Sequence, residues 1–164
     1  MDDPHIRPAI RADLEAINDI HNHYVRHSTC TFMIEPEPIG DRIAWFDAHG
    51  PEHPVIVAES GGQVAGWGAL SRFHPRPAYG HTVENSVYVR HDLQHRGIGR
   101  ALLADLIVRA KALGHHSIMA LITADQTPSV RLHASMGFVQ AAHLKEVGFK
   151  FGRWLDVVYL QLML

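Results

Sequence analysis

Apolar residues recur at two different spacings along the chain, and each spacing predicts a different kind of element. A stripe at helical spacing, followed by Gly114, contains Ile98, Leu102, Leu103, Leu106, Ile107 and Ala110. It predicts an amphipathic helix over residues 97–113. A second stripe follows Asp13, which we expect to cap its helix. Its members are Leu14, Ile17, Ile20 or His21, Tyr24 and Val25. Further helices are expected over residues 39–49, closed by Gly50 and Pro51, and over residues 128–136.

Shorter apolar runs, rich in β-branched residues, predict strands. The runs 54–60 and 63–70 flank Gly61 and Gly62, an arrangement typical of a β-hairpin. Other strands are expected over residues 5–10, 82–90, 117–123, 139–143 and 154–163, and loops over the proline-containing segments 29–38 and 72–81. This order predicts an α/β fold whose mixed sheet is covered by helices on both faces. No repeat or linker interrupts the chain, so residues 1–164 are expected to form a single domain.

Composition and charge narrow the class of protein. The formal net charge is −2 and the pI is near 6.7, so no basic surplus exists to neutralise a phosphate backbone. The longest apolar runs are far shorter than the ~20 residues that a membrane helix needs, and the first residues lack the order of a signal peptide. Cys30 is the only cysteine, which excludes an internal disulfide and fits a reducing compartment. We therefore expect a cytoplasmic protein without nucleic-acid or membrane partners.

The chain contains 14 histidines, which raises the question of a metal site. His23 and His27 are four residues apart and can share one face of a helix. However, no His-Glu-x-x-His or Cys-x-x-Cys pattern is present to support a metal. We expect no metal site, and we expect the histidines to lie on the solvent surface, with His133 as the exception discussed below.

The segment 87–102 carries the most specific chemical signal. A predicted strand ends there, and a polar turn leads to a helix that opens with Gly97-Ile98-Gly99. The first N–H groups of a helix have no internal partner, and glycine lets a ligand approach the backbone closely, so a pyrophosphate fits this site. Arg96 and Arg100 add positive charge. A Rossmann fingerprint needs a glycine where Leu102 stands, and the Gly-Lys-Ser/Thr of a Walker A loop is missing.

The pattern Gln94-x-x-Gly97-x-Gly99 resembles the acetyl-CoA-binding motif of the GNAT superfamily, Q/R-x-x-G-x-G/A. A closer resemblance covers nearly the whole chain. The stretches 82–89, 128–133 and 147–156 are similar to those of the phosphinothricin acetyltransferase group, which includes methionine sulfone and sulfoximine acetyltransferases. This resemblance implies the GNAT fold, a mixed and mostly antiparallel central sheet flanked by helices on both faces. It also implies acetyl-CoA as cosubstrate, a small amine as acceptor, and a homodimer.

The resemblance also assigns residues to the acetyl-CoA site. The backbone of the strand at 87–89 would hold the pantetheine arm and polarise the thioester carbonyl, and the turn at 95–100 would bind the pyrophosphate. Gln126 stands where the family usually has an asparagine that contacts the cofactor. The complete predicted set is Val87, Tyr88, Val89, Gln94, His95, Arg96, Gly97, Ile98, Gly99, Arg100, Gln126 and Ser129.

Two residues are candidates for proton transfer. An amine attacks a thioester only when it is neutral, and Glu84 matches the proposed base of the family. The alternative for Glu84 is an exposed strand carboxylate. His133 stands four residues before Gly137, where many GNAT enzymes have a tyrosine that protonates the departing thiolate, and histidine is a competent acid near neutrality. The alternative for His133 is a helix histidine that packs near the cofactor.

The acceptor pocket is expected to include Phe32, Arg76, Tyr79, Thr82 and Glu84, with Trp154 as a further wall. Arg76 would pair with a carboxylate. The alternative for Phe32, Tyr79 and Trp154 is ordinary core packing. Met33 stands where phosphinothricin enzymes often have arginine, which favours methionine sulfoximine, methionine sulfone or another small amine. Two rival functions remain at this stage: a GNAT enzyme acting on a protein N-terminus or a polyamine, and a non-catalytic acyl-CoA-binding sensor.

Overall fold

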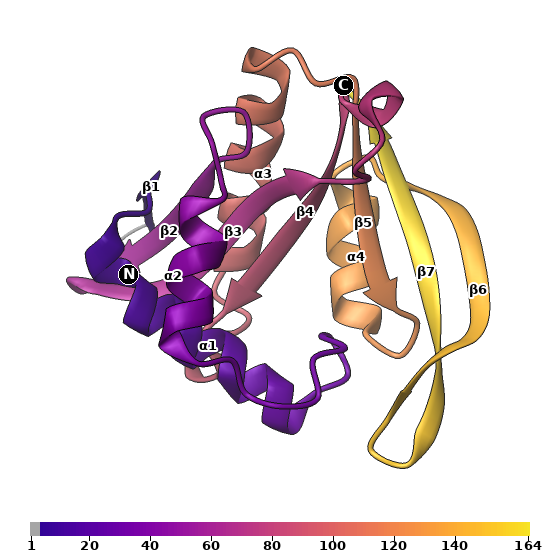
Figure 1. The fold of residues 1–164 in the computed structure, drawn as a ribbon, viewed down its shortest axis with the longest axis horizontal. Coiled ribbons are helices and arrows are strands. Elements are labelled where there is room, and N and C mark those ends of the chain that lie inside the picture. The colour runs from indigo at the N-terminus through magenta and orange to yellow at the C-terminus, as the bar shows by residue number, and fades with distance from the viewer. Residues whose placement is uncertain (1–3) are drawn as a thin grey trace.

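The computed structural model describes residues 4–164 as one seven-stranded sheet with four α-helices (Figure 1). The elements are β1 (His5–Pro8), α1 (Leu14–His27), α2 (Ile39–Asp47), β2 (Val55–Ser60), β3 (Gln63–Arg72), β4 (Thr82–Val89), α3 (Ile98–Ala112), β5 (Ser117–Thr123), α4 (Thr127–Ser135), β6 (Val139–Lys150) and β7 (Arg153–Met163). Short 3-10 turns precede α1 and flank β4. The predicted order of strands and helices is confirmed.

The strands lie in the order β1-β2-β3-β4-β5-β7-β6. Neighbouring strands are antiparallel except β4 and β5, which form the one parallel pair of the described sheet. Helices α1 and α2 cover one face, and α3 and α4 cover the other (Figure 1). The predicted fold class, a mixed and mostly antiparallel sheet flanked on both faces, is therefore confirmed.

Each face of the sheet has its own core. Leu102, Leu103 and Leu106 of α3 are fully buried against one face, and Leu14 and Ile17 of α1 are buried against the other. Helix α3 packs directly onto two glycines of β3. A Cβ at Gly66 would lie 3.2 Å from the Leu102 side chain, and one at Gly68 would lie 3.0 Å from Leu106. This close packing of α3 on β3 places the first turn of α3 beside the end of β4.

Two expectations about element ends need correction. Asp13 does not cap α1: its carboxylate accepts a hydrogen bond from the backbone N–H of Ile10, at 2.8 Å, and pairs with Arg7. Strand β6 runs to Lys150 rather than ending at residue 143, with irregular register between Leu144 and Gly148. Its second half is mostly exposed and carries Lys145 and Glu146, so it shows no alternation that predicts a strand, and pairing with β7 defines it instead.

The described residues 4–164 contain no helix that is long and apolar enough to cross a membrane. The same part of the chain holds no group of three or more His, Cys, Asp or Glu side chains arranged to bind a metal ion.

Candidate active site

The two parallel strands separate halfway along their length. Strand β4 pairs with β5 only from Thr82 to Glu84, opposite residues 117–119. Beyond this point β4 continues to pair with β3, and β5 continues to pair with β7. The edges that face each other are therefore left open. A cavity of about 810 Å³ fills this opening and extends between α3, α4 and the segment 30–32.

Most of the predicted cofactor residues line this cavity. They are Val87, Tyr88, Val89, Gln94, His95, Gly97, Ile98, Gly99, Arg100, Gln126 and Ser129. Arg96 is exposed and is not part of the lining. The predicted catalytic residues Glu84 and His133 line the cavity too, as does Phe32. These residues come from separate elements of the chain and border one continuous cavity.

The first turn of α3 forms the mouth of the cavity. Gly97 precedes the helix with φ of +80°, in the left-handed region that favours glycine, and His95 adopts φ of +61°. No side chain caps the helix, so its first N–H groups are free to bind an anion. This geometry follows directly from the glycine pattern in the sequence.

Gln94 lines the cavity and is also engaged within the protein, so its predicted contact with the cofactor stays a prediction. Its side-chain amide donates a hydrogen bond to the Tyr24 hydroxyl at 2.7 Å, and Tyr24 donates to the carbonyl oxygen of Val89 at 2.6 Å. The three residues fasten α1 to the end of β4 and to the turn before α3. Tyr24 also lines the cavity, a role that its place in an apolar helical stripe did not indicate.

Gln126 is also engaged within the protein. Its amide nitrogen donates to the Thr29 hydroxyl at 2.8 Å, and that hydroxyl donates to Asp125. The longer side chain, compared with the family asparagine, thus ties the start of α4 to the segment after α1. The predicted contact between Gln126 and the cofactor stays a prediction.

Glu84 lies half-buried on β4, on the same face of the strand as Tyr88. It forms no hydrogen bond or ion pair with any residue in the described part of the chain. Burial raises the pKa of this carboxyl above its ordinary value. The alternative of an exposed strand carboxylate is therefore excluded. A half-buried carboxylate with a raised pKa and no partner among the described residues is suited to act as a general base.

His133 is buried on α4 and is held at both ring nitrogens. Nδ1 lies 2.9 Å from the carbonyl oxygen of Ser129, and Nε2 lies 2.9 Å from the amide nitrogen of Asn85. A carbonyl oxygen only accepts hydrogen bonds, so Nδ1 carries the proton and Nε2 accepts from Asn85. Burial lowers the pKa of His133, which keeps the ring neutral. In this arrangement Nε2 has no proton to donate to a thiolate.

Residues 30–32, in the segment 28–38 between α1 and α2, line the cavity and are held by β6. The ammonium of Lys150, only 4% exposed, donates to the carbonyl oxygens of Ser28 and Thr31, both at 2.8 Å. The ring of Phe32 lies so close to Gly148 that a side chain at that position would collide with it. The backbone around Thr31 and Phe32 is therefore fixed from the β6 side.

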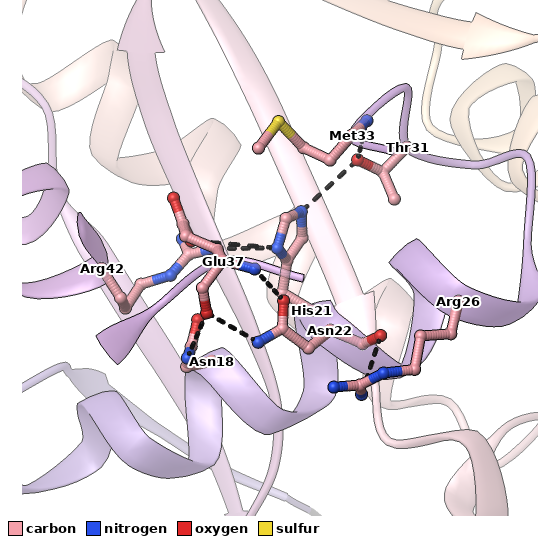
Figure 2. Close-up of polar contacts among 8 residues, drawn as sticks. All are labelled: Asn18, His21, Asn22, Arg26, Thr31, Met33, Glu37 and Arg42. Carbon is pink, nitrogen blue, oxygen red and sulfur yellow. Dashed lines mark hydrogen bonds and ion pairs between the residues drawn. The ribbon is translucent and has the colours of Figure 1, made fainter. Parts of the chain in front are cut away.

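A buried polar network fixes the other end of this segment (Figure 2). Arg42 pairs with the Glu37 carboxylate and donates to Nδ1 of His21 at 2.9 Å. Asn18 and Asn22 donate to the carbonyl oxygen of Glu37, at 3.0 and 2.9 Å. The network joins α1 and α2 and holds the end of the segment 28–38 in place.

Two histidines contradict the expectation of a solvent surface. Burial, together with the charges of Arg42 and Lys150, lowers the pKa of His21 to about 4, so it is neutral inside the network. His115 is buried as well, and its Nε2 lies 2.8 Å from the carbonyl oxygen of Glu52. Both histidines can be buried because a protein group satisfies a ring nitrogen.

Several predicted acceptor residues do not line the cavity of the single chain. Arg76 and Tyr79 are exposed on the loop between β3 and β4, and Thr82 exchanges a hydrogen bond with Ser117. Trp154 is 62% exposed on β7, and Met33 is 46% exposed beyond Phe32. Of the predicted acceptor set, only Phe32 and Glu84 border the cavity.

Strands β4 and β5 separate to leave a cavity, and helix α3 begins after Gly97 at the mouth of that cavity. Together these two features define the class of protein: an acyltransferase fold of the kind that the sequence motif indicates. The sequence matches the Acetyltransferase (GNAT) family over residues 17–138, and the chain belongs to that family.

Relatives and solved structures agree with this assignment. The chain is 41% identical to the L-amino acid N-acyltransferase MnaT of Escherichia coli, over 97% of this chain and 93% of that protein. It is 39% identical to an L-methionine sulfoximine/L-methionine sulfone acetyltransferase of Salmonella typhimurium, over 97% and 94%. A phosphinothricin acetyltransferase from Sinorhizobium meliloti, solved in complex with AcCoA, superposes with a TM-score of 0.97 at 34% identity, over 99% of this chain and 89% of that one.

Proposed function

We propose that this protein transfers the acetyl group of acetyl-CoA to the α-amine of a small amino acid or amino-acid analogue. The observation that carries the proposal is one cavity that runs from the uncapped first turn of α3 to the unpaired carboxylate of Glu84. The turn offers N–H groups to the phosphates, and Glu84 offers a base to the amine. The names of the relatives above support both the acetyl donor and the amino-acid acceptor.

The chain's own groups divide the work of the reaction. The unpaired backbone edge of β4 beyond Glu84 would bind the pantetheine arm, and an N–H there would polarise the thioester carbonyl. Glu84 would take a proton from the incoming ammonium, directly or through water. The segment 30–32 would exclude water from the acceptor. Acetyl-CoA supplies the activated acetyl group when bound.

A thiol-release assay tests this function. Purified protein should release free thiol from acetyl-CoA when amino acids such as methionine sulfoximine are added, and little without an acceptor. Release that is independent of any amine would indicate a hydrolase, and release only with peptides or polyamines would favour the rival acceptors. Binding of acetyl-CoA without any release would favour a sensor.

Gly99 offers a sharp test of the phosphate site. Gly99→Asp places a carboxylate beside the expected phosphates and should weaken acetyl-CoA binding by about tenfold or more. Gly99→Ala is the matched control, because its Cβ would make ordinary contacts, 3.5 Å from Leu132 and 3.6 Å from Val89. Titration calorimetry measures both. Equal acetyl-CoA affinities for Gly99→Asp and Gly99→Ala would show that the phosphates do not bind at this turn.

The lining of the acceptor end favours a neutral substrate side chain. Among the described residues that line the cavity, the only Lys or Arg is Arg100, on the first turn of α3. The walls from residues 30–32, β6 and β7 include Phe32, Leu144, Val147, Val157 and Tyr159. A phosphinate would be desolvated there without a partner, which is costly. We therefore expect a higher kcat/KM for methionine sulfoximine or sulfone than for phosphinothricin.

Position 144 checks this reasoning better than position 33. Leu144 lines the cavity whereas Met33 does not, so Leu144→Arg should reduce the preference for methionine sulfoximine over phosphinothricin, and Met33→Arg should leave that preference unchanged. A wild-type kcat/KM for phosphinothricin equal to or above that for methionine sulfoximine would refute the argument.

We further propose that residues 1–164 act as a single domain, in the cytoplasm, as part of a homodimer. The exposed apolar residues of β6, β7 and the turn between them support the dimer: Val147, Phe149, Phe151 and Trp154 are each more than half exposed. A second copy over this strip would remove that apolar surface from water. The predicted acceptor contacts of Arg76, Tyr79 and Thr82 stay part of the proposal.

A further inference from the structure

Asn85 and His133 meet where the two parallel strands separate. Asn85 is the first residue of β4 beyond the stretch that pairs with β5. Its side chain lines the cavity on the face opposite Glu84, although the residue is only 7% exposed. His133 reaches it from α4. A group that enters between the strands therefore reaches Glu84 on one side and Asn85 on the other.

The hydrogen bonds of His133 fix the orientation of the Asn85 amide. Because Ser129 holds the proton on Nδ1, Nε2 is an acceptor, and only the amide nitrogen of Asn85 can face it. That nitrogen carries two hydrogens and uses one. The carbonyl oxygen of Asn85 has no hydrogen-bond partner among the described residues.

An unused donor and an unpartnered acceptor on one buried side chain point to a ligand. Leaving a buried polar group unsatisfied costs about 1–3 kcal/mol. Most buried polar side-chain atoms in proteins have a hydrogen-bond partner. The Asn85 oxygen has none among the described residues, and the side chain borders the cavity that we assign to the acyl donor.

We propose that Asn85 is a catalytic residue that contacts the thioester end of the acyl donor, and that His133 is a positioning residue that orients the Asn85 amide. The inference rests on the acetyl transfer proposed above. It replaces the expectation that His133 itself protonates the departing thiolate.

The step balances without a proton from His133. The amine nitrogen forms a bond to the thioester carbonyl carbon, and the carbon–sulfur bond breaks. The sulfur leaves with the bonding electron pair, and the second N–H of Asn85 donates a hydrogen bond to it. The nitrogen loses two protons in all. Glu84 takes the first from the ammonium and passes it to water before the attack, and it takes the second as the amide forms, while the released thiolate takes a proton from water. The products are the amide, the free thiol and one proton released to solvent.

Four variants separate this arrangement from general-acid catalysis by His133. Asn85→Leu and His133→Leu should each lower kcat by about 10²-fold, the usual cost of losing one oriented donor. Asn85→Gln tests whether the position of the amide matters, because it keeps the amide but moves it by one methylene. Its kcat should also fall below that of wild type. His133→Gln is the decisive change, because glutamine can present an acceptor oxygen to Asn85 but has no ionisable proton.

The outcome for His133→Gln decides between the two roles. We expect its kcat to stay within about tenfold of wild type, whereas loss of a general acid costs about 10²–10⁴-fold. The dissociation constant of acetyl-CoA and the melting temperature are measured alongside, so that unfolding is not mistaken for lost catalysis. A His133→Gln variant as slow as His133→Leu, or an Asn85→Leu variant as fast as wild type, would overturn the proposal.

A binding measurement keeps this proposal separate from the function on which it rests. In ¹⁵N spectra of the wild-type protein, His133 should show the neutral form protonated at Nδ1, and acetyl-CoA should shift the side-chain amide signals of Asn85. If wild type bound acetyl-CoA but acetylated no amine, the proposed function would fail while this contact would still be tested. Unmoved Asn85 signals, or a His133 ring protonated at Nε2, would refute the contact.

Discussion

Replacing Glu84 by glutamine should lower kcat by about 10²–10⁴-fold, the usual cost of removing a general base. Glutamine keeps the size and a carbonyl oxygen but cannot take the proton of the ammonium. Acetyl-CoA should bind to the variant almost as tightly as to wild type, because Glu84 lies at the far end of the cavity from the first turn of α3. Glu35→Gln, on the exposed segment before α2, is the matched control.

The pH profile gives this prediction a second readout. Burial raises the pKa of Glu84, so the carboxyl loses its proton at a higher pH than an exposed glutamate does. The wild-type rate should therefore fall as the pH drops through that raised pKa, because the base becomes protonated. Glu84→Gln should lose this acidic limb. A variant with the wild-type rate and the wild-type acidic limb would remove Glu84 from the mechanism.

Removing the Glu37 carboxylate should lower the free energy of unfolding by about 3 kcal/mol, because Arg42 would be left as an unpaired buried charge. The side chain of Arg42 is 4% exposed and that of Glu37 is 15% exposed, so water screens the pair poorly. Urea unfolding of Glu37→Ala measures the loss. Glu35→Ala, two residues away and exposed, should change stability by no more than about 0.5 kcal/mol.

A double substitution identifies the cause of that loss. Arg42→Met combined with Glu37→Leu removes both charges, so it should recover much of the stability that Glu37→Ala loses. Glu37→Ala should also raise the KM of the acceptor more than that of acetyl-CoA, because the network (Figure 2) holds the segment whose residues 30–32 would exclude water from the acceptor. If Glu37→Ala were as stable as Glu35→Ala, the network would have no anchoring role.

Most of the fold was predictable because its signals are local. The stripe ending at Gly114 and the glycines between β2 and β3 each specify an element by spacing alone. The glycines at 97 and 99 likewise located the mouth of the cavity. The second half of β6 was not predictable, because an exposed strand with Lys145 and Glu146 carries no apolar alternation. Only its pairing with β7 makes it a strand.

The hydrogen-bond partners within the site could not be predicted from sequence. Gln94 bonds to Tyr24, 70 residues away, and Gln126 bonds to Thr29, 97 residues away. The family motif indicated that such residues belong to the site, but a motif does not show whether a side chain faces the ligand or another part of the chain. The same holds for His133, whose chemistry depends on Ser129 and Asn85 holding one tautomer.

The most direct test of the central claim is the fate of the acetyl group. Acetyl-CoA labelled with ¹³C in the acetyl carbonyl is incubated with the protein and methionine sulfoximine, and the products are identified by mass spectrometry. We expect the label in N-acetyl-methionine sulfoximine, in the same amount as the thiol released, with almost none formed by Glu84→Gln. Label found only in free acetate, or no turnover with any amino acid offered, would contradict the assignment.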